Sequence, residues 1–249
     1  MMERAFVYGD LLFETIKVKN GEICFASKHF NRLIQSANVL KFETTSLTLE
    51  VFVQEIIKKL SGKKNARVRF VLYRNSKGFY TPTSNDCKWN IEIFELPEED
   101  KICKRLGIFS EYKKSCNKLS NIKSGNALIY VLAGMYAKQN QFDDCLILNE
   151  HGRIAEAISS TIFIVKGGTL YTPPLLEGCV DGVMKHVVIE KAKELGINTE
   201  EIPLTQNQIL DADEVFLTNA IKGIVPVYSL QAKIFTTTFI SKLKSILEL

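Results

Sequence analysis

The alternation and spacing of hydrophobic residues predict short strands and amphipathic helices along the chain. Two short strands, 13–18 and 22–26, flank Lys19-Asn20-Gly21, and an Asn-Gly pair between apolar runs indicates a tight hairpin. Apolar residues then recur at spacings of three and four, which predicts helices over about 28–40 and about 47–60. The N-terminal part is therefore expected to begin as a hairpin followed by two helices.

Further strands and a polar stretch indicate where a first domain ends. The runs 67–73 and 89–96 have the composition of strands. Residues from about 111 to 121 are polar and contain few apolar side chains, so we place the boundary there. This interpretation gives an N-terminal domain over 1–113, a linker over 114–121 and a C-terminal domain over 122–249.

The second half mixes helices and strands again. Leu128, Val131, Leu132 and Met135 have the i, i+3, i+4, i+7 spacing of a helix, which we expect over about 124–138. Another helix is expected to begin at Asp181-Gly182 and to end before Gly196. Further strands are expected over 145–149, 153–156, 161–165 and 212–218, and a short helix at the C-terminus. Strands and helices alternate irregularly, so the predicted class is α+β or mixed α/β in two domains.

Composition and charge exclude several classes of function. The chain has 249 residues, of which 46% are hydrophobic and 24% charged, so it can bury a substantial core and long disorder is not expected. A net charge of +4 without clustered Lys and Arg argues against nucleic acid as a partner and suits a small acidic substrate. Apolar runs of about 18 residues are absent, and the first residues lack the apolar core of a signal peptide, so no membrane partner is expected.

Cysteine and histidine usage indicates a reducing compartment and no metal. The six cysteines are scattered and form no C-x-x-C pair, so we expect reduced thiols in a cytoplasmic protein. Only three histidines occur, His29, His151 and His186, and no two have the spacing of metal ligands. The sequence therefore predicts no metal site.

Lys123 is a candidate for covalent chemistry. It directly precedes the helix expected from 124, and a helix dipole disfavours an ammonium group at the helix N-terminus. A neutral amine is the form in which a lysine attacks a carbonyl carbon. The alternative interpretation is a solvated lysine beside a helix, and Lys123 considered alone does not decide between them.

Glu156 and several phosphate-binding candidates complete a set. Glu156 ends a strand, and if it faces inward it needs a cationic partner such as a protonated pyridine nitrogen; otherwise it is a solvated carboxylate. Asp181 and Gly182 open a helix, so the N–H groups of Val183 and Met184 can bind an anion, or the helix is merely capped. Arg32 can bind phosphate with two hydrogen bonds or lie on the surface. Asn219-Ala220, at the end of a strand, can add a loop N–H.

An amine, a carboxylate and phosphate-binding groups together are what a pyridoxal phosphate enzyme requires. The chain resembles the class IV pyridoxal phosphate aminotransferase family (fold type IV), which includes branched-chain and D-amino acid aminotransferases and aminodeoxychorismate lyases. The resemblance covers about residues 8–227. The matching segments, in the family's order, are YGDLLFETIKV (8–18), HFNRLIQSANVL (29–40), RFVLYR (69–74), NIKSGNALIYVLA (121–133), RIAEAISSTIFIV (153–165), TLYTPP (169–174), GCVDGVMKHVVIEKAKELG (178–196) and DADEVFLTNAIKGIVPV (211–227).

The resemblance implies a fold and a role for each candidate. The implied fold is like that of D-amino acid aminotransferase, with a smaller N-terminal α+β domain and a larger, β-barrel-like C-terminal domain with flanking helices; the implied assembly is a homodimer. Lys123 would form the Schiff base with pyridoxal 5'-phosphate, and Glu156 would pair with the pyridine nitrogen. The phosphate would be bound by the residues of the matching motifs, namely Arg32, Val183, Met184, Asn219 and Ala220.

Three motifs resemble the lyase branch most. They are Lys123-Ser-Gly-Asn, Asp181-Gly-Val-Met-Lys and Thr218-Asn-Ala. This branch implies a 4-amino-4-deoxychorismate lyase that forms 4-aminobenzoate and pyruvate. The alternative is an amino acid aminotransferase that passes an amino group to a 2-oxo acid, and a non-catalytic homologue is a third reading.

Substrates of both branches carry carboxylates, for which Arg69, Arg74 and Lys222 are the candidate partners. The chain also departs from the family pattern. Leu11 and Thr161 replace a usual glycine and asparagine, and the sequence starts just before the YGD motif, so the family's opening strand pair is not expected.

Overall fold

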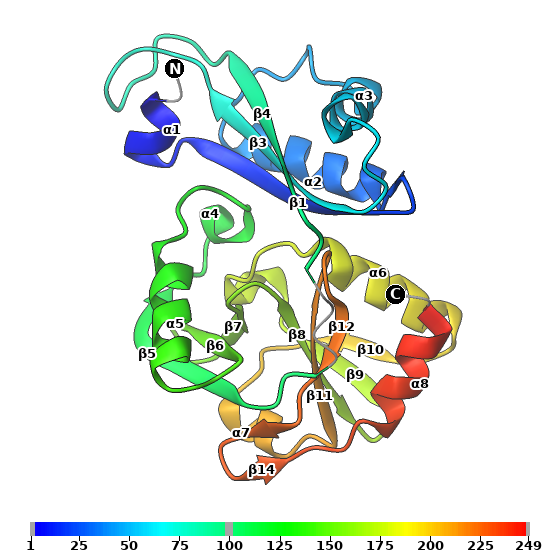
Figure 1. Cartoon of the computed structure of the whole chain (residues 1–249). Coiled ribbons are helices and arrows are strands. Elements are labelled where there is room, and N and C mark those ends of the chain that lie inside the picture. The colour runs from blue at the N-terminus through cyan, green and yellow to red at the C-terminus, as the bar shows by residue number, and fades with distance from the viewer. Residues whose placement is uncertain (1–2, 98–101, 248–249) are drawn as a thin grey trace. The chain divides into compact units, whose positions relative to one another are not determined.

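Two units of structure are formed by the residues that the computed structural model describes, 3–97 and 102–247 (Figure 1). Unit 1 consists of Met1–Glu98 and Ile122–Asn126. Unit 2 consists of Glu99–Asn121 and Ala127–Leu249. The short segment 122–126 therefore belongs to unit 1, although the residues on either side of it belong to unit 2.

Unit 1 is an antiparallel sheet in the order β2-β1-β3-β4 with two helices on one face. Asn20 and Gly21 both have positive φ, 54° and 87°, which is the geometry of the expected two-residue hairpin turn between β1 and β2. Thr48 caps the second large helix by accepting from the Val51 N–H at 3.2 Å. The elements are α1 (Glu3–Tyr8), β1 (Leu11–Lys19), β2 (Glu22–Ile23), α2 (Ala26–Val39), α3 (Leu49–Leu60), β3 (Ala66–Arg74) and β4 (Cys87–Phe94).

The core of unit 1 follows from strand alternation. Every second residue of β1 and β3, including Ile16 and Val68, is buried against α2 and α3, where Leu33 and Phe52 lie. The residues between them face the other side of the sheet. This alternation decides which functional side chains of unit 1 share a face.

Unit 2 contains two five-stranded sheets, β10-β9-β8-β11-β12 and β14-β13-β5-β6-β7. The first is built from β8 (Thr161–Lys166), β9 (Thr169–Thr172), β10 (Thr199–Glu201), β11 (Glu214–Asn219) and β12 (Gly223–Pro226). The second is built from β5 (Leu106–Lys114), β6 (Asp144–Asn149), β7 (Ile154–Ala157), β13 (Ser229–Leu230) and β14 (Lys233–Ile234). The other elements are α4 (Lys118–Asn121), α5 (Leu128–Gln139), η1 (Leu175–Glu177), α6 (Val183–Glu194), α7 (Gln206–Leu210) and α8 (Thr238–Leu247).

Both faces of these sheets are covered. Leu146 of β6 and Leu217 of β11 belong to one cluster between the sheets, whereas Ile147 packs with α5 and Phe216 packs with α6 and α8. Figure 1 shows α5 beside β5 and β6, and α6 and α8 beside the other sheet. Burial on both faces explains why the strands of unit 2 have continuous rather than alternating apolar sequences.

The division into units differs from the boundary expected at 114–121. Strand β5 pairs in parallel with β6, from Leu106 opposite Asp144 to Lys114 opposite Asn149, and so lies in a sheet of unit 2. Residues 110–113 of β5 are exposed, which is why the stretch resembled a linker. Within residues 3–97 and 102–247, no helix is long and apolar enough to span a membrane.

Candidate functional site

Pairing with β1 fixes the segment that carries Lys123 in unit 1. The Phe13 N–H donates to the Lys123 carbonyl at 2.9 Å, and the Gly125 N–H donates to the Leu11 carbonyl at 3.0 Å. A Cβ on Gly125 would lie 2.8 Å from Leu11 Cγ and 3.2 Å from the Gly9 carbonyl, so glycine permits this approach. The Lys123 amine lies 4.5 Å from the centre of the Phe13 ring. Strand β1 therefore sets the position of the Lys123 side chain.

The expected place of Lys123 at the start of a helix is wrong. Helix α5 begins at Leu128, and residues 124–127 are not helical. A helix dipole acts over the first turn only, so it does not reach the Lys123 amine. Lys123 is half-buried, and its amine lies against the Phe13 ring rather than at the start of a helix.

Arg32 of α2 is oriented by a buried carboxylate of β1. Its Nε donates to Glu14 Oε1 at 2.8 Å, and its Nη2 donates to Glu14 Oε2. His29 Nδ1 lies 2.7 Å from the same Oε2. Because strand side chains alternate, Glu14 points to the helix side of β1 and Phe13 to the other side. Arg32 is thus held in one orientation, as a phosphate-binding arginine needs to be.

The charge of Glu14 makes unit 1 sensitive to acid. Burial alone would raise the pKa of Glu14, but the Arg32 charge and the hydrogen bonds from His29 and Arg32 outweigh burial and lower the pKa from 4.5 to about 2. A carboxyl with a lowered folded-state pKa contributes stability that is fully present above pH 4.5 and is lost as the pH falls through about 2. At about 1.4 kcal/mol per pKa unit, this contribution is roughly 3 kcal/mol.

We therefore expect Glu14→Gln to flatten the fall in unfolding free energy below pH 4.5. The measurement is urea unfolding at several pH values above and below this point. The exposed Glu22→Gln is the matched control and should leave the pH profile of the wild type unchanged. A Glu14→Gln profile as steep as that of the wild type would contradict the assignment.

The two arginines expected to bind substrate differ in their surroundings. Arg69 lies on the same sheet face as Phe13, because Thr15 is opposite Arg69 and Phe13 is opposite Val71 in the register of β1 and β3. The Arg69 side chain is 40% exposed, and its Nη1 lies 3.7 Å from Glu92. Arg69 is therefore accessible on the face that carries the Lys123 amine.

Arg74, in contrast, has a structural role, which corrects its expected one. Its Nε donates to Asp10 Oδ2 at 2.9 Å, its Nη1 donates to Asn85 Oδ1, and its Nη2 donates to the Leu40 carbonyl at 2.7 Å. The residue is only 8% exposed. Since all three guanidinium nitrogens bind within unit 1, we do not retain Arg74 as a substrate ligand.

In unit 2, Glu156 lies at the centre of a buried hydrogen-bond network. Its Oε1 accepts from Lys114 Nζ and from the Tyr130 hydroxyl, the latter at 2.7 Å. Its Oε2 accepts from the Val180 N–H at 3.1 Å. Glu156 is 5% exposed and Lys114 is 6% exposed. The carboxylate faces inward and has a cationic partner, so the interpretation of Glu156 as a solvated residue is wrong.

Lys114 and Tyr130 hold this carboxylate in place. Lys114 also donates to the Ser120 carbonyl at 3.2 Å and to the Tyr130 hydroxyl oxygen at 2.6 Å. Burial raises the pKa of Tyr130, and the neighbouring charge of Glu156 raises it further, so the hydroxyl stays protonated and donates. Sequence reasoning missed both residues, because they become neighbours of Glu156 only when β5, α5 and β7 pack.

Removing the Lys114 charge is expected to destabilise unit 2. Lys114→Met leaves Glu156 as an uncompensated buried carboxylate, and breaking a buried pair in this way costs about 3–5 kcal/mol. Urea unfolding measures the loss. The exposed neighbour Lys113→Met is the matched control and should change the unfolding free energy by less than about 0.5 kcal/mol. Equal stability of the two variants would show that the pair is not formed.

The N-terminus of α6 presents Val183 and Met184 as expected, but the cap is different. Gly182, not Asp181, is the N-cap, and no side chain among the described residues caps the helix. Asp181 instead lies 2.6 Å from His186 Nε2 and raises the pKa of that histidine. A Cβ on Gly182 would lie 2.6 Å from the Thr161 hydroxyl oxygen. The backbone N–H groups of the first turn thus lie next to the start of β8.

The turn after β11 lies at the same place in unit 2. Asn219 Oδ1 accepts from the N–H groups of Ile221 at 3.0 Å and Lys222 at 2.9 Å. Its Nδ2 donates to Ser160 Oγ at 3.0 Å, next to Thr161. The Asn219 side chain therefore shapes the turn that contains Ala220. The start of β8, the turn 219–222 and the N-terminus of α6 are brought together by these contacts.

A buried, charge-paired carboxylate and a set of helix and turn N–H groups suit a phosphate-bearing pyridine cofactor, and comparison with known proteins gives the family. The chain matches the family model described as amino-transferase class IV over residues 11–230. It belongs to the class IV aminotransferase family, a family of pyridoxal phosphate-dependent enzymes, as its motifs suggested. The mixed α/β fold of fold type IV expected from the resemblance is confirmed by the solved structures that match.

Relatives in this family carry the names of two different activities. The chain is 31% identical over 242 residues to a Methanocaldococcus jannaschii protein provisionally named a branched-chain-amino-acid aminotransferase, covering 94% of this chain and 83% of that protein. It is 30% identical over 234 residues to the aminodeoxychorismate lyase of Bacillus subtilis, covering 90% and 78%. A crystal structure from Legionella pneumophila, provisionally named 4-amino-4-deoxychorismate lyase, superposes with a TM-score of 0.91 at 27% identity, covering 98% of this chain and 92% of that one.

Proposed function

We propose that this chain binds pyridoxal 5'-phosphate and acts as a 4-amino-4-deoxychorismate lyase that forms 4-aminobenzoate and pyruvate. The observation that carries the proposal is the buried Glu156 carboxylate, which is paired with Lys114 and accepts a hydrogen bond from Tyr130. An ionised carboxylate in a buried site suits a protonated pyridine nitrogen. The lyase motifs and the Bacillus subtilis relative support the choice of reaction.

Glu156 and the N-terminus of α6 have hydrogen-bonding capacity that suits the cofactor. Glu156 Oε2 accepts one hydrogen bond, from Val180, and a carboxylate oxygen can accept two, so a pyridinium N–H can be added. The N–H groups of Val183 and Met184, without a side-chain cap, suit a phosphate group. The Ala220 N–H and Arg32 are the further proposed phosphate ligands. When bound, pyridoxal phosphate supplies an electron sink for the charge that develops on the substrate.

Each residue then has a defined task in the proposed reaction. Lys123 would supply the amine that holds the cofactor aldehyde and, as a neutral amine, would act as the general base that takes a proton from the substrate. Glu156 holds a proton on the pyridine nitrogen, because its negative charge favours the pyridinium form. Arg69 and Lys222 are proposed to bind the substrate carboxylates. In the lyase reaction, loss of the proton that Lys123 takes and cleavage of the carbon–oxygen bond to the ring would release the enol form of pyruvate, which takes up a proton at carbon to become pyruvate.

An aminotransferase is the second candidate, favoured by the Methanocaldococcus jannaschii relative. It would use Lys123 and Glu156 in the same way, with Lys123 also returning the proton that it took, and water would supply the carbonyl oxygen of the 2-oxo acid that leaves. The residues proposed for each role suit either reaction. Only the requirement for an amino acceptor separates them.

To separate the two reactions, the purified protein is assayed with each set of substrates. One sample receives aminodeoxychorismate alone, and the other receives branched-chain or D-amino acids with 2-oxoglutarate. Release of pyruvate and 4-aminobenzoate without a 2-oxo acid is the expected result. Turnover only with amino acid and 2-oxoglutarate would select the aminotransferase, and Lys123→Ala serves as the blank for both assays.

We also propose that the chain forms a homodimer through helix α5, which would be a soluble, cytoplasmic assembly. Leu128, Val131, Leu132 and Met135 are 74%, 55%, 39% and 54% exposed, although such an apolar stripe normally faces a core. The residues of α5 that are buried in unit 2 are Ala133 and Ala137. A contiguous exposed apolar face is typical of an interaction surface.

A charge on this stripe is expected to weaken self-association. Leu128→Asp should raise the dimer dissociation constant at least about 30-fold, because it places a carboxylate in an apolar contact. Analytical ultracentrifugation over a concentration series measures the constant. Lys193→Glu, an exposed position on α6, is the matched control. A monomeric wild type, or a Leu128→Asp variant that associates as tightly as the wild type, would contradict the proposal.

A further inference from the structure

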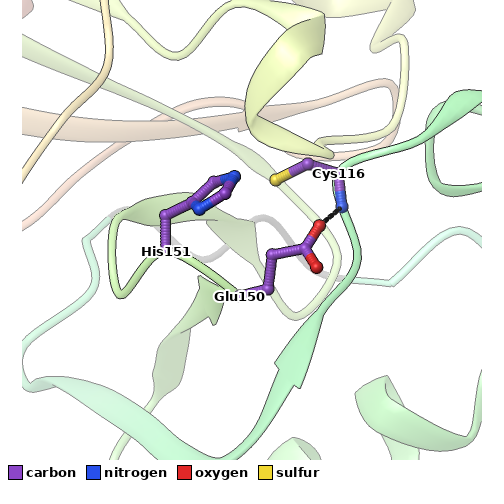
Figure 2. A group of neighbouring side chains, drawn as sticks. All are labelled: Cys116, Glu150 and His151. Atoms are coloured by element: carbon purple, nitrogen blue, oxygen red, sulfur yellow. Dashed lines mark hydrogen bonds between the residues drawn. The ribbon is translucent and has the colours of Figure 1, made fainter.

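The loop after β5 and the turn between β6 and β7 bring three side chains of types that can ligate a metal together in unit 2. Figure 2 shows the thiol of Cys116 beside the side chains of Glu150 and His151. One potential ligand atom from each residue lies within 4.8 Å of those from the other two. Ligand atoms of a tetrahedral zinc ion lie about 2.0–2.3 Å from the metal, so three atoms within 4.8 Å of one another occupy a region of the size of one coordination sphere.

The backbone of both ligand-bearing segments is fixed without a metal. Asn149 Oδ1 accepts from the His151 and Arg153 N–H groups at 3.1 and 3.0 Å, and its Nδ2 donates to Glu177 Oε2 at 2.7 Å. Asn149 is fully buried. The turn that carries Glu150 and His151 is therefore attached to the segment that ends at Glu177.

The next residue of that segment, Gly178, fixes Cys116. A Cβ on Gly178 would lie 2.5 Å from the Ser115 carbonyl and 3.5 Å from Cys116 Cα, so the two backbones are in close contact. The Cys116 N–H donates to Glu150 Oε1 at 2.6 Å, and the Glu150 N–H donates to the Lys114 carbonyl at 2.8 Å. The segment that carries Cys116 and the turn that carries Glu150 and His151 thus both contact residues 177–178, and they also contact each other. A site with fixed ligands loses little conformational freedom when it binds an ion.

Charge at this position also suits a divalent ion. A thiolate and a carboxylate carry two negative charges, and a neutral imidazole adds none. The nearby Arg153 is neutralised, since its Nε and Nη2 donate to the Glu177 oxygens at 2.6 and 2.8 Å. Sulfur, nitrogen and oxygen together suit Zn²⁺ and similar transition-metal ions and do not suit Mg²⁺ or Ca²⁺, which take oxygen ligands.

We propose that Cys116, Glu150 and His151 form a binding site for a divalent transition-metal ion of the Zn²⁺ type, with water as the fourth ligand. Binding releases the Cys116 proton to solvent and leaves the oxidation state of the ion unchanged. The site joins the loop after β5 to the β6–β7 turn. The sequence did not reveal it, because Cys116 and Glu150 are 34 positions apart and only one histidine takes part.

Cobalt(II) is the probe for this site. The full chain with its cofactor is freed of metal by dialysis against a chelator and titrated with cobalt(II) chloride. We expect one equivalent to bind with the visible absorption of four-coordinate cobalt, and zinc(II) chloride to displace it. Cys116→Ser and His151→Ala should each weaken binding at least about 10-fold. Binding should also raise the thermal unfolding midpoint of the wild type but not of the two variants.

Two variants control for nonspecific binding of cobalt by thiols and for misfolding of Cys116→Ser. Cys24 is a half-buried cysteine of unit 1, so Cys24→Ser tests whether any thiol binds cobalt, and it should titrate like the wild type. His151 is exposed, so His151→Ala tests the site even if Cys116→Ser does not fold. Absence of four-coordinate absorption, or equal cobalt affinity of wild type and His151→Ala, would overturn the proposal. So would a loss of binding in Cys24→Ser.

Discussion

Lys123→Ala is expected to lower the turnover rate by at least about 10⁴-fold, whichever substrate set the enzyme uses. The amine has two tasks in the proposed reaction, covalent attachment of the cofactor and proton transfer, and alanine performs neither. The fold should survive, because the backbone bonds of this segment to Phe13 and Leu11 do not involve the side chain. Steady-state assays with circular dichroism as a check on folding measure the effect.

A second lysine of the preceding segment is the control for this variant. Lys118→Ala removes an exposed amine from α4 and should leave turnover within about twofold of the wild type. If Lys123→Ala retained more than a small fraction of the activity while Lys118→Ala lost it, the catalytic amine would be elsewhere. The prediction concerns chemistry alone, so it holds for the lyase and for the aminotransferase.

Glu156→Gln is expected to slow turnover by roughly 100-fold or more while pyridoxal phosphate still binds. Glutamine has nearly the same size but no charge, so it no longer favours a proton on the pyridine nitrogen and the electron sink weakens. Because the amide also leaves Lys114 without its ionised partner, some loss of stability is expected as well. Cofactor occupancy by absorbance and turnover per bound cofactor are therefore measured separately.

Glu111→Gln provides the comparison for the Glu156 variant. Glu111 is an exposed carboxylate of β5, and its loss should change neither occupancy nor turnover. Unchanged turnover per bound cofactor in Glu156→Gln would remove Glu156 from the reacting site. Loss of occupancy without a change in turnover per bound cofactor would give Glu156 a binding role only.

Local sequence patterns predicted most of the elements of this fold. The Asn20-Gly21 turn, the α2 and α3 helices and the strands β6, β8 and β11 follow from turn chemistry and apolar spacing over a few residues. Strand β5 was missed because its second half is exposed, so it has the polar composition of a linker. The segment 122–126 was assigned to the wrong side of the boundary because its partner, β1, is distant in sequence.

Less of the candidate site than of the fold could be predicted from the sequence. Family motifs identified Glu156, but its partners Lys114 and Tyr130 come from a polar stretch and from an amphipathic helix with no distinguishing pattern. Aspartate is a common N-cap residue, but the Asp181 side chain contacts His186 instead of capping α6, and the sequence does not show which of these two interactions is preferred. Arg74 illustrates the same difficulty, since its structural partners lie in three separate segments.

The most direct test of the central claim is borohydride reduction of the wild-type chain with pyridoxal phosphate, followed by digestion and mass spectrometry. Reduction fixes the cofactor permanently to the amine that holds it. The account predicts one modified lysine, Lys123, in the peptide that contains Ser124 and Gly125. Cofactor attached instead to a different lysine, such as the buried Lys114 or Lys185, or no attachment at all, would contradict it.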